Sequence, residues 1–182
     1  MSFHPTTQRL VLRAPMLSDL PAFVAILNDY DVAKNLQKVP HPFTAPLFRE
    51  ALARCDRERR DGAVYSFAVT RALDGNVIGM CSMERGENGA WEFGYWYGKT
   101  YWRQGYATEA ARPVMRFAFE DMAADRLTAG WFDDNPASGA VLHKLGFAIT
   151  GVEPVRCLAR GCEVLCNRVQ LTRDEFARKK AQ

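Results

Sequence analysis

The sequence predicts one α/β domain in which helices flank a mixed sheet, and three observations support this. The chain has 182 residues, which suits one domain of residues 1–182, because domains typically hold about 100–150 residues. Its composition, 48% hydrophobic and 25% charged, is that of a folded chain rather than a disordered one. The apolar periodicity alternates between strand-like and helix-like stretches, in the order β-α-α-β-β-β-α-β-α-β-β.

The first third of the chain is expected to hold one strand and two helices. Residues 9–13 alternate weakly between apolar and polar side chains, which indicates a strand. Ser18 is expected to cap a helix that continues to about Asn28, because an acidic residue and a proline follow it. Residues 29–42 are irregular, with room for one short helical turn. A second helix is expected over residues 44–61, opened by a proline and closed by glycine.

The periodicity then changes to that of strands. Three strands are expected at residues 64–70, 77–84 and 91–97, because these runs alternate and contain β-branched and aromatic residues. Turns at residues 74–76 and 86–89 connect them, since both contain glycine and asparagine.

The second half begins with the longest helical pattern, over residues 107–124, whose apolar side chains share one face. Pro113 lies inside it and predicts a bend, because proline removes one backbone hydrogen bond. Residues 126–132 are expected to form a strand. Asn135 is expected to cap a short helix that ends at Gly146, since proline follows the cap and glycine suits the helix end.

Two final strands are expected at about residues 148–158 and 162–171, with a turn near residues 160–161. The basic residues 178–180 are expected to be a frayed end.

Charge and cysteine usage exclude several classes of protein. The net charge of +3 and the pI near 8.6 are too mild to indicate a nucleic-acid-binding protein. No run of about 18 apolar residues is present for a membrane helix, and the start of the chain lacks the pattern of a signal peptide. The spacing of Cys157, Cys162 and Cys166 fits a zinc site poorly. We therefore expect no metal, and free thiols in a cytoplasmic protein.

The segment with the clearest chemistry is residues 91–110, WEFGYWYGKTYWRQGYATEA. A strand ends, a short loop carries Gly105, and a long helix begins. The first N–H groups of a helix lack helical partners, and the dipole places about half a positive charge there. Gly105 allows a phosphate to approach the backbone, and Ala107 adds little bulk. The alternative is a tight turn whose small residues serve packing. No Gly-Lys-Ser/Thr follows and no full GxGxxG is present, which excludes the two common nucleotide motifs.

Four stretches in order resemble the GNAT superfamily of N-acetyltransferases, and within it the branch of ribosomal-protein-alanine N-acetyltransferases. They are residues 9–20, 92–97, 102–110 and 135–147, and the resemblance covers about residues 8–172. It implies the single-domain acyl-CoA N-acyltransferase fold, with a mixed, mostly antiparallel sheet, a splayed central strand pair and flanking helices.

The resemblance also implies acetyl-CoA as the cofactor, with coenzyme A as the product. The loop before the long helix would offer backbone N–H groups to the pyrophosphate, and the strand before it would pair with the pantetheine arm. The splayed strand at residues 126–132 would leave the gap for that arm. Asn135 would contact the arm, and its alternative role is the helix cap alone. The cofactor-binding residues implied are Tyr95, Trp96, Tyr97, Arg103, Gln104, Gly105, Tyr106, Ala107, Thr108 and Asn135.

Amine acetylation requires a base, because a lysine has a pKa of about 10.4 and a chain amino terminus one of about 7.7–8.0. Glu92 is the first candidate, directly or through water, with a structural salt bridge as its alternative role; Glu84 is a weaker candidate. Many superfamily members have a tyrosine acid where this chain has Leu142, so that mechanism does not carry over. Ser138 matches the serine of the branch and would support the departing thiolate; its alternative is a small helix-face residue.

These features predict an enzyme, an acetyl-CoA-dependent N-acetyltransferase in which the amine attacks directly within a ternary complex. The favoured acceptor is a protein N-terminal α-amine, and residues 18–62 are expected to build its wall. The alternatives are a small-molecule amine, such as a metabolite or antibiotic, and a non-catalytic acyl-CoA-binding sensor. A nucleic-acid-associated module would instead bind in a salt-sensitive manner. We expect no nucleic-acid or membrane partner, and a homodimer through the final hairpin stays open.

Overall fold

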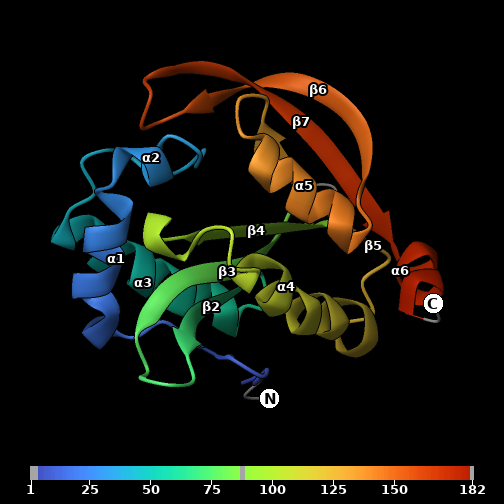
Figure 1. The fold of residues 1–182 in the computed structure, drawn as a ribbon, viewed down its shortest axis with the longest axis horizontal. Helices are drawn as coiled ribbons and strands as arrows, with labels where there is room; N and C mark the ends of the chain where they lie inside the picture. The colour runs from blue at the N-terminus through green and yellow to red at the C-terminus, as the bar shows by residue number, and fades with distance from the viewer. Residues whose placement is uncertain (1–3, 87–88, 181–182) are drawn as a thin grey trace.

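Seven strands of the computed structural model form a single mixed sheet in the order β1-β2-β3-β4-β5-β7-β6 (Figure 1). The structure describes residues 4–86 and 89–180, so the turn predicted at residues 86–89 lies partly outside it. The strands are β1 (Leu10–Arg13), β2 (Val64–Arg71), β3 (Val77–Arg85), β4 (Trp91–Tyr97), β5 (Arg126–Phe132), β6 (Ala148–Cys157) and β7 (Cys162–Thr172). The helices are η1 (Leu17–Asp19), α1 (Leu20–Leu27), α2 (Tyr30–Ala33), α3 (Ala45–Arg60), η2 (Lys99–Tyr101), α4 (Tyr106–Arg116), η3 (Phe117–Asp121), α5 (Pro136–Leu145) and α6 (Arg173–Lys180).

The sheet consists of two antiparallel halves that meet at a short parallel contact. Strands β1 to β4 pair in sequence order, and β7 pairs with both β5 and β6. Between the halves, β4 and β5 pair in parallel only at Trp91 with Leu127 and Glu92 with Thr128. Beyond Glu92 the two strands separate, which confirms the predicted splayed pair. We call the unpaired stretch, residues 93–97 beside residues 129–132, the split.

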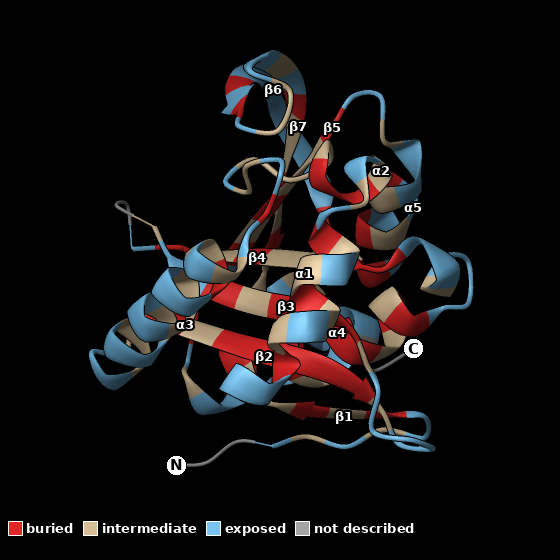
Figure 2. Cartoon of the chain, turned by 90° about the vertical axis from the view of Figure 1, so that its left-hand side faces the viewer, coloured by how far each residue is buried: buried red, intermediate tan, exposed pale blue. Residues whose placement is uncertain are grey.

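Apolar side chains on both faces of the sheet hold the helices in place. One core joins α4 and α5 to the sheet, and among its buried members are Met83, Phe93, Val114, Leu127 and Leu142. A second core joins α1 and α3 to the opposite face, and it contains Phe23, Phe48, Ala68 and Trp96. Because side chains alternate along a strand, β4 supplies Phe93 to the first core and Trp96 to the second. The mainly buried β2 contrasts in Figure 2 with α3, whose residues are nearly all exposed or intermediate.

The first helix begins differently from the prediction. Ser18 is not its cap; it lies inside the short 3-10 helix η1, which precedes α1. Asp19 is the organising residue instead, because its carboxylate accepts a 2.8 Å hydrogen bond from the Met16 N–H and forms a 2.7 Å ion pair with Arg13. The short helical turn expected within residues 29–42 is confirmed as α2.

Two other elements also differ from the prediction. The helix expected over residues 107–124 is an α-helix only to Arg116, and the wider π turn η3 follows. The basic tail is not frayed but forms α6. Its start is held by the Glu175 carboxylate, which accepts hydrogen bonds of 2.8 and 2.7 Å from the N–H and hydroxyl of Thr172. Phe176 stacks on Phe119 with 4.7 Å between ring centroids. Among the described residues, no helix is long and apolar enough to cross a membrane.

Candidate active site

The loop before α4 has the geometry of an anion site. Arg103 and Gly105 both adopt left-handed backbone conformations, with φ of 60° and 80°. A non-glycine residue in that region costs about 1–3 kcal/mol, and such strain is concentrated at functional sites. The first helical hydrogen bond is donated by the Glu109 N–H to the Gly105 carbonyl at 3.0 Å. The N–H groups of residues 106–108 therefore precede the helical bonds, at the positive end of the dipole.

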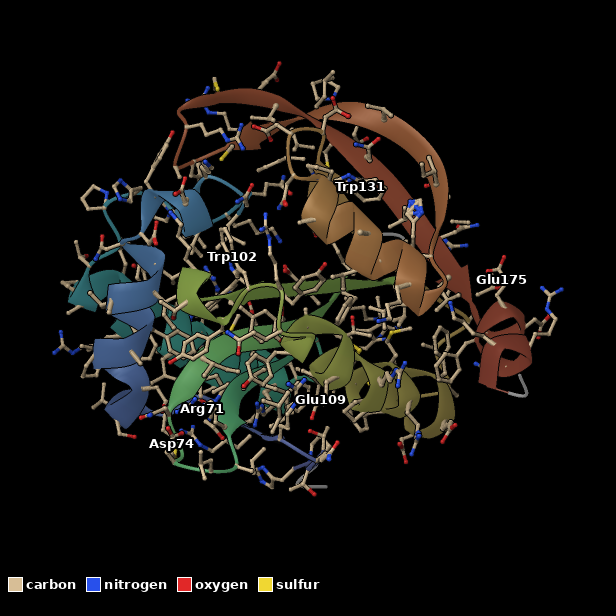
Figure 3. The ribbon with its side chains drawn as sticks, in the orientation of Figure 1. Arg71, Asp74, Trp102, Glu109, Trp131 and Glu175 are labelled. Atoms are coloured by element: carbon tan, nitrogen blue, oxygen red, sulfur yellow. The ribbon has the colours of Figure 1, made fainter. Side chains whose placement is uncertain are left out.

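Thr7 and Arg9, near the start of the chain, hold this loop through hydrogen bonds to Glu109 and Gln104, and we call these contacts the brace. The carboxylate of Glu109, labelled in Figure 3, accepts hydrogen bonds from the Thr7 hydroxyl at 2.6 Å, the Arg9 N–H at 3.0 Å and Arg9 Nε at 2.7 Å. Arg9 also donates to the Gln104 carbonyl at 3.0 Å, and its guanidinium lies 4.4 Å from the Tyr106 ring centre. Burial raises the pKa of Glu109, but the Thr7 and Arg9 hydrogen bonds and the Arg9 charge outweigh it, so the pKa is lowered overall.

The backbone of β4 is directed alternately toward β3 and toward the split. The Gly98 N–H donates to the Ile78 carbonyl at 3.0 Å, and antiparallel ladders exchange such bonds at every second residue. Trp96 therefore directs its backbone groups toward β3, and its carbonyl lies where a side chain on Gly79 would stand. By the same alternation, the groups of Tyr95 and Tyr97 are directed toward the split.

Trp102 fixes the passage from β4 into the loop. Its indole Nε1–H donates to the Tyr97 carbonyl at 2.8 Å (Figure 3). That bond occupies one of the groups directed toward the split. The N–H of Tyr97 and both backbone groups of Tyr95 are also directed toward the split. The sequence did not indicate this use of the tryptophan.

The N-terminus of α5 lies on the other side of the split. Asn135 is the helix cap, and its side chain accepts a 3.3 Å hydrogen bond from the Ser138 N–H. The helix packs tightly on β5, because a Cβ on Gly139 would stand 2.7 Å from the ring of Trp131, which Figure 3 labels beside α5. The Ser138 hydroxyl lies 2.9 Å from the phenol oxygen of Tyr95. The cap role of Asn135 is confirmed, and Ser138 is placed against β4.

Glu92 belongs to a group of charged side chains on the face of the sheet opposite α4 and α5. Its carboxylate is 40% exposed and pairs with Arg168 at 3.0 Å; Arg168 also binds Glu153 at 2.7 Å. Directly opposite Glu92 in the sheet register is Glu84, which pairs with Lys38 at 2.8 Å. The salt bridge considered as the alternative role of Glu92 is thus present, and it places Glu92 at the closed end of the split.

Two phenols and one thiol near the split are held in their protonated forms. Burial raises the pKa of Cys81 to about 12, and its sulfur lies 3.3 Å from the Tyr97 hydroxyl. Burial also raises the pKa of Tyr95 and of Tyr97 above the usual range. Leu142 is buried in the core beneath α5 and carries no acidic proton. The described residues contain no group of three or more His, Cys, Asp or Glu side chains arranged for a metal ion.

The tip of the β6–β7 hairpin is fastened to the segment that follows α2. Arg160 donates to the Lys34 carbonyl at 2.7 Å and pairs with Asp134 at 2.7 Å. The Leu158 N–H donates to the Gln37 carbonyl at 3.1 Å. We call these contacts, made by residues 157–160 with residues 34–37 and with Asp134, the clasp. Figure 1 shows the hairpin reaching toward α2. Sequence reasoning did not predict this contact between the hairpin and part of residues 18–62, the segment expected to build the acceptor wall.

A mixed sheet that opens between two parallel strands, beside a glycine-initiated helix with free N–H groups, defines an acyl-CoA-dependent N-acyltransferase. The chain belongs to the GNAT acetyltransferase family, because the sequence profile of the acetyltransferase (GNAT) domain matches residues 9–148. The uncharacterized N-acetyltransferase YoaA of Bacillus subtilis is 30% identical over 157 residues, covering 80% of this chain and 83% of YoaA.

Solved structures support the same fold. The ribosomal-protein-S5-alanine acetyltransferase of Vibrio fischeri superposes with a TM-score of 0.82 at 19% identity, over 96% of this chain and 98% of that one. The spermidine N-acetyltransferase of Vibrio cholerae, solved with CoA and spermine, gives a TM-score of 0.78 at 17% identity, over 94% and 99%. These likenesses concern the fold, and the two proteins have acceptors of different kinds.

Proposed function

We propose that this N-acetyltransferase, a single catalytic domain of residues 1–182, transfers the acetyl group of acetyl-CoA to the α-amino group of a protein. The observation that carries the choice of acceptor is the ion pair between Glu92 and Arg168. The Arg168 guanidinium occupies Glu92 Oε1 at 3.0 Å, so part of the capacity of this carboxylate to accept a proton from the amine is taken up by the ion pair. An α-amine, with a pKa of about 7.7–8.0, needs less help from a base than a lysine with a pKa of about 10.4, so a carboxylate already engaged in an ion pair suits the α-amine better.

The residues around the split fit acetyl-CoA. The N–H groups of residues 106–108 at the start of α4, with the preceding loop residues 103–105, would bind the pyrophosphate in the manner of other helix N-termini that bind anions. Both backbone groups of Tyr95 and the N–H of Tyr97 offer the pantetheine arm an edge to pair with, and Asn135 lies at the start of α5. Acetyl-CoA supplies the activated acyl group, as a thioester whose sulfur leaves as a thiolate.

Glu92 and Ser138 have separate roles in this proposal. Glu92 takes the proton of the attacking amine through water, from the face of the sheet opposite α4 and α5. Ser138 offers a hydroxyl hydrogen bond to the sulfur as negative charge develops there. No covalent enzyme intermediate is required, because the amine nitrogen attacks the carbonyl carbon directly.

The five cysteines are free, which supports a reducing compartment such as the cytoplasm.

The test is thiol release from acetyl-CoA with two separate substrate pools, short peptides with free amino termini and small amines including polyamines. Release with the peptides alone supports the proposal. Release with small amines alone overturns the choice of acceptor and favours a small-molecule acetyltransferase. CoA binding without release in either pool favours the acyl-CoA sensor. Glu92→Gln should lower kcat with peptides and leave CoA binding unchanged, and full turnover in that variant would remove Glu92 as the base.

A further inference from the structure

We propose that Tyr95 is a positioning residue for acetyl transfer, whose phenol holds the Ser138 hydroxyl so that the serine proton is directed at the departing sulfur. The inference rests on the proposed function, which places Ser138 beside the thioester. It adds a role for the side chain of Tyr95, whereas the proposed function uses only its backbone.

The contact joins β4 to α5, the helix that follows β5 on the other side of the split. Tyr95 lies three residues beyond Glu92, the last residue of β4 that pairs with β5. Its hydroxyl lies 2.9 Å from Ser138 Oγ and 3.2 Å from the Ser138 carbonyl oxygen. Both partners are fixed, because Phe93 and Tyr97 contact the Tyr95 ring and the Asn135 cap holds the Ser138 N–H. The phenol therefore meets a serine that has little freedom to move.

The proton positions give this pair two arrangements. In one, the phenol donates to the Ser138 carbonyl and the serine hydroxyl donates to the phenol oxygen. In the other, the phenol donates to Ser138 Oγ, and the serine proton is free to point into the split. Negative charge on the departing sulfur favours the second arrangement, since only that one offers a donor to the sulfur. The interaction is stronger in the transition state than in the ground state, which is the condition for raising kcat.

Neither Tyr95 nor Ser138 loses its proton in this scheme. The amine nitrogen forms the bond to the carbonyl carbon, the C–S bond breaks, and sulfur leaves with the electron pair. The proton lost by nitrogen goes through water to Glu92. Burial of Tyr95 keeps its pKa above the usual range, so the phenol acts as a hydrogen-bond donor and not as an acid. This phenol lies on β4. The position on α5 where many superfamily members have a tyrosine acid holds the buried Leu142 in this chain.

The experiment compares Tyr95→Phe, Ser138→Ala, the double variant and the control Tyr65→Phe. Tyr65 lies on β2, two strands from the split, and is partly buried against the same core. The first readout is kcat and KM for acetyl-CoA. The second is the pKa of the CoA thiol bound to the enzyme, followed by thiolate absorbance with desulfo-CoA as the blank. The second readout needs no acceptor and does not respond to a purely structural role.

Ser138→Ala should lower kcat by about 100-fold, the size seen when a transition-state donor is removed. Tyr95→Phe should lower kcat by about tenfold with an unchanged KM, and should raise the bound thiol pKa by about one unit, the equivalent of that factor. The double variant should match Ser138→Ala alone, because coupled residues are not additive. Tyr65→Phe should match the wild type in both readouts.

A Tyr95→Phe enzyme with wild-type kcat and thiol pKa overturns the proposal, as does a change in KM alone. If that variant does not fold, Ser138→Thr and Ser138→Ala carry the test. Threonine keeps the hydroxyl and should keep the wild-type thiol pKa, and equal pKa values in the two variants overturn the proposal. A wild-type protein that binds CoA but releases no thiol with any amine overturns the proposed function instead, which separates the two failures.

Discussion

Replacement of Glu109 by glutamine tests whether the brace from the start of the chain stabilises the loop before α4. Glutamine keeps an acceptor oxygen and the side-chain length but loses the charge. Hydrogen bonds to a charged group contribute about 1.5–3 kcal/mol, against about 1 kcal/mol between neutral groups. The Arg9 side chain is 43% exposed, so solvent screens part of the difference. We expect a loss of about 1–2 kcal/mol in the free energy of unfolding, and a Tm lower by about 2–8 °C for a chain of this size.

The assay is urea and thermal unfolding followed by circular dichroism, with Glu50→Gln as the control. Glu50 is an exposed acid on α3, on another part of the surface. A change in Glu109→Gln no larger than in the control, within about 0.5 kcal/mol as for ordinary surface substitutions, would refute the reasoning. The brace would then be an incidental surface contact.

The same variant predicts a pH dependence. The pKa of Glu109 is lowered in the folded chain, so its contribution to stability is fully present above the unfolded value, about 4.3. The contribution is lost as the pH falls through the lower, folded value. The stability difference between the wild type and Glu109→Gln should therefore be constant near neutral pH and shrink in acid. A difference that grew in acid would contradict the assignment.

Three further predictions concern the α5 packing, the clasp and the thiols. Gly139→Ala should destabilise the protein by about 1–3 kcal/mol, as overpacking does, because its Cβ would meet the rigid ring of Trp131; unchanged urea unfolding would contradict this. Arg160→Ala should speed amide hydrogen exchange at the hairpin tip, since it removes the clasp ion pair; equal exchange would show that the tip is held by other contacts. Iodoacetamide at pH 8 should label the exposed Cys162 well before Cys81, because burial raises the pKa of Cys81 to about 12. Mass spectrometry follows the order of labelling, and earlier labelling of Cys81 would contradict this prediction.

Local periodicity was sufficient to predict most of the architecture. Strand and helix boundaries depend on residues within a few positions, such as the Asn135 cap and the left-handed Gly146 that ends α5. The misassigned elements depend on other physics. α6 persists because Phe176 stacks on Phe119, which lies in a distant element, and the polar composition of the tail alone suggested fraying.

The site likewise contains features that follow from local sequence and features that depend on distant residues. The loop glycine and the helix start are local signals, and the sequence predicted both. The brace joins Arg9 to Glu109 across 100 positions, and the Tyr95 contact with Ser138 spans 43. Neither pair leaves a periodic or spaced pattern in the chain, because a tertiary hydrogen bond constrains two side chains and not the residues between them. Resemblance to the family identified the segments, whereas the folded structure shows which side chains meet.

The clasp bears on the order in which the molecule assembles. Its hydrogen bonds from Cys157 and Arg160 join positions 121 to 126 residues apart, whereas β2, β3 and β4 pair with their sequence neighbours. Contacts of high sequence separation form late, because the entropy of closing a long loop must be overcome first. On a ribosome, the clasp can therefore form only after the β6–β7 hairpin has emerged. Pulse-labelling hydrogen exchange during refolding should protect β2–β4 amides before that of Leu158, and simultaneous protection would show concerted assembly.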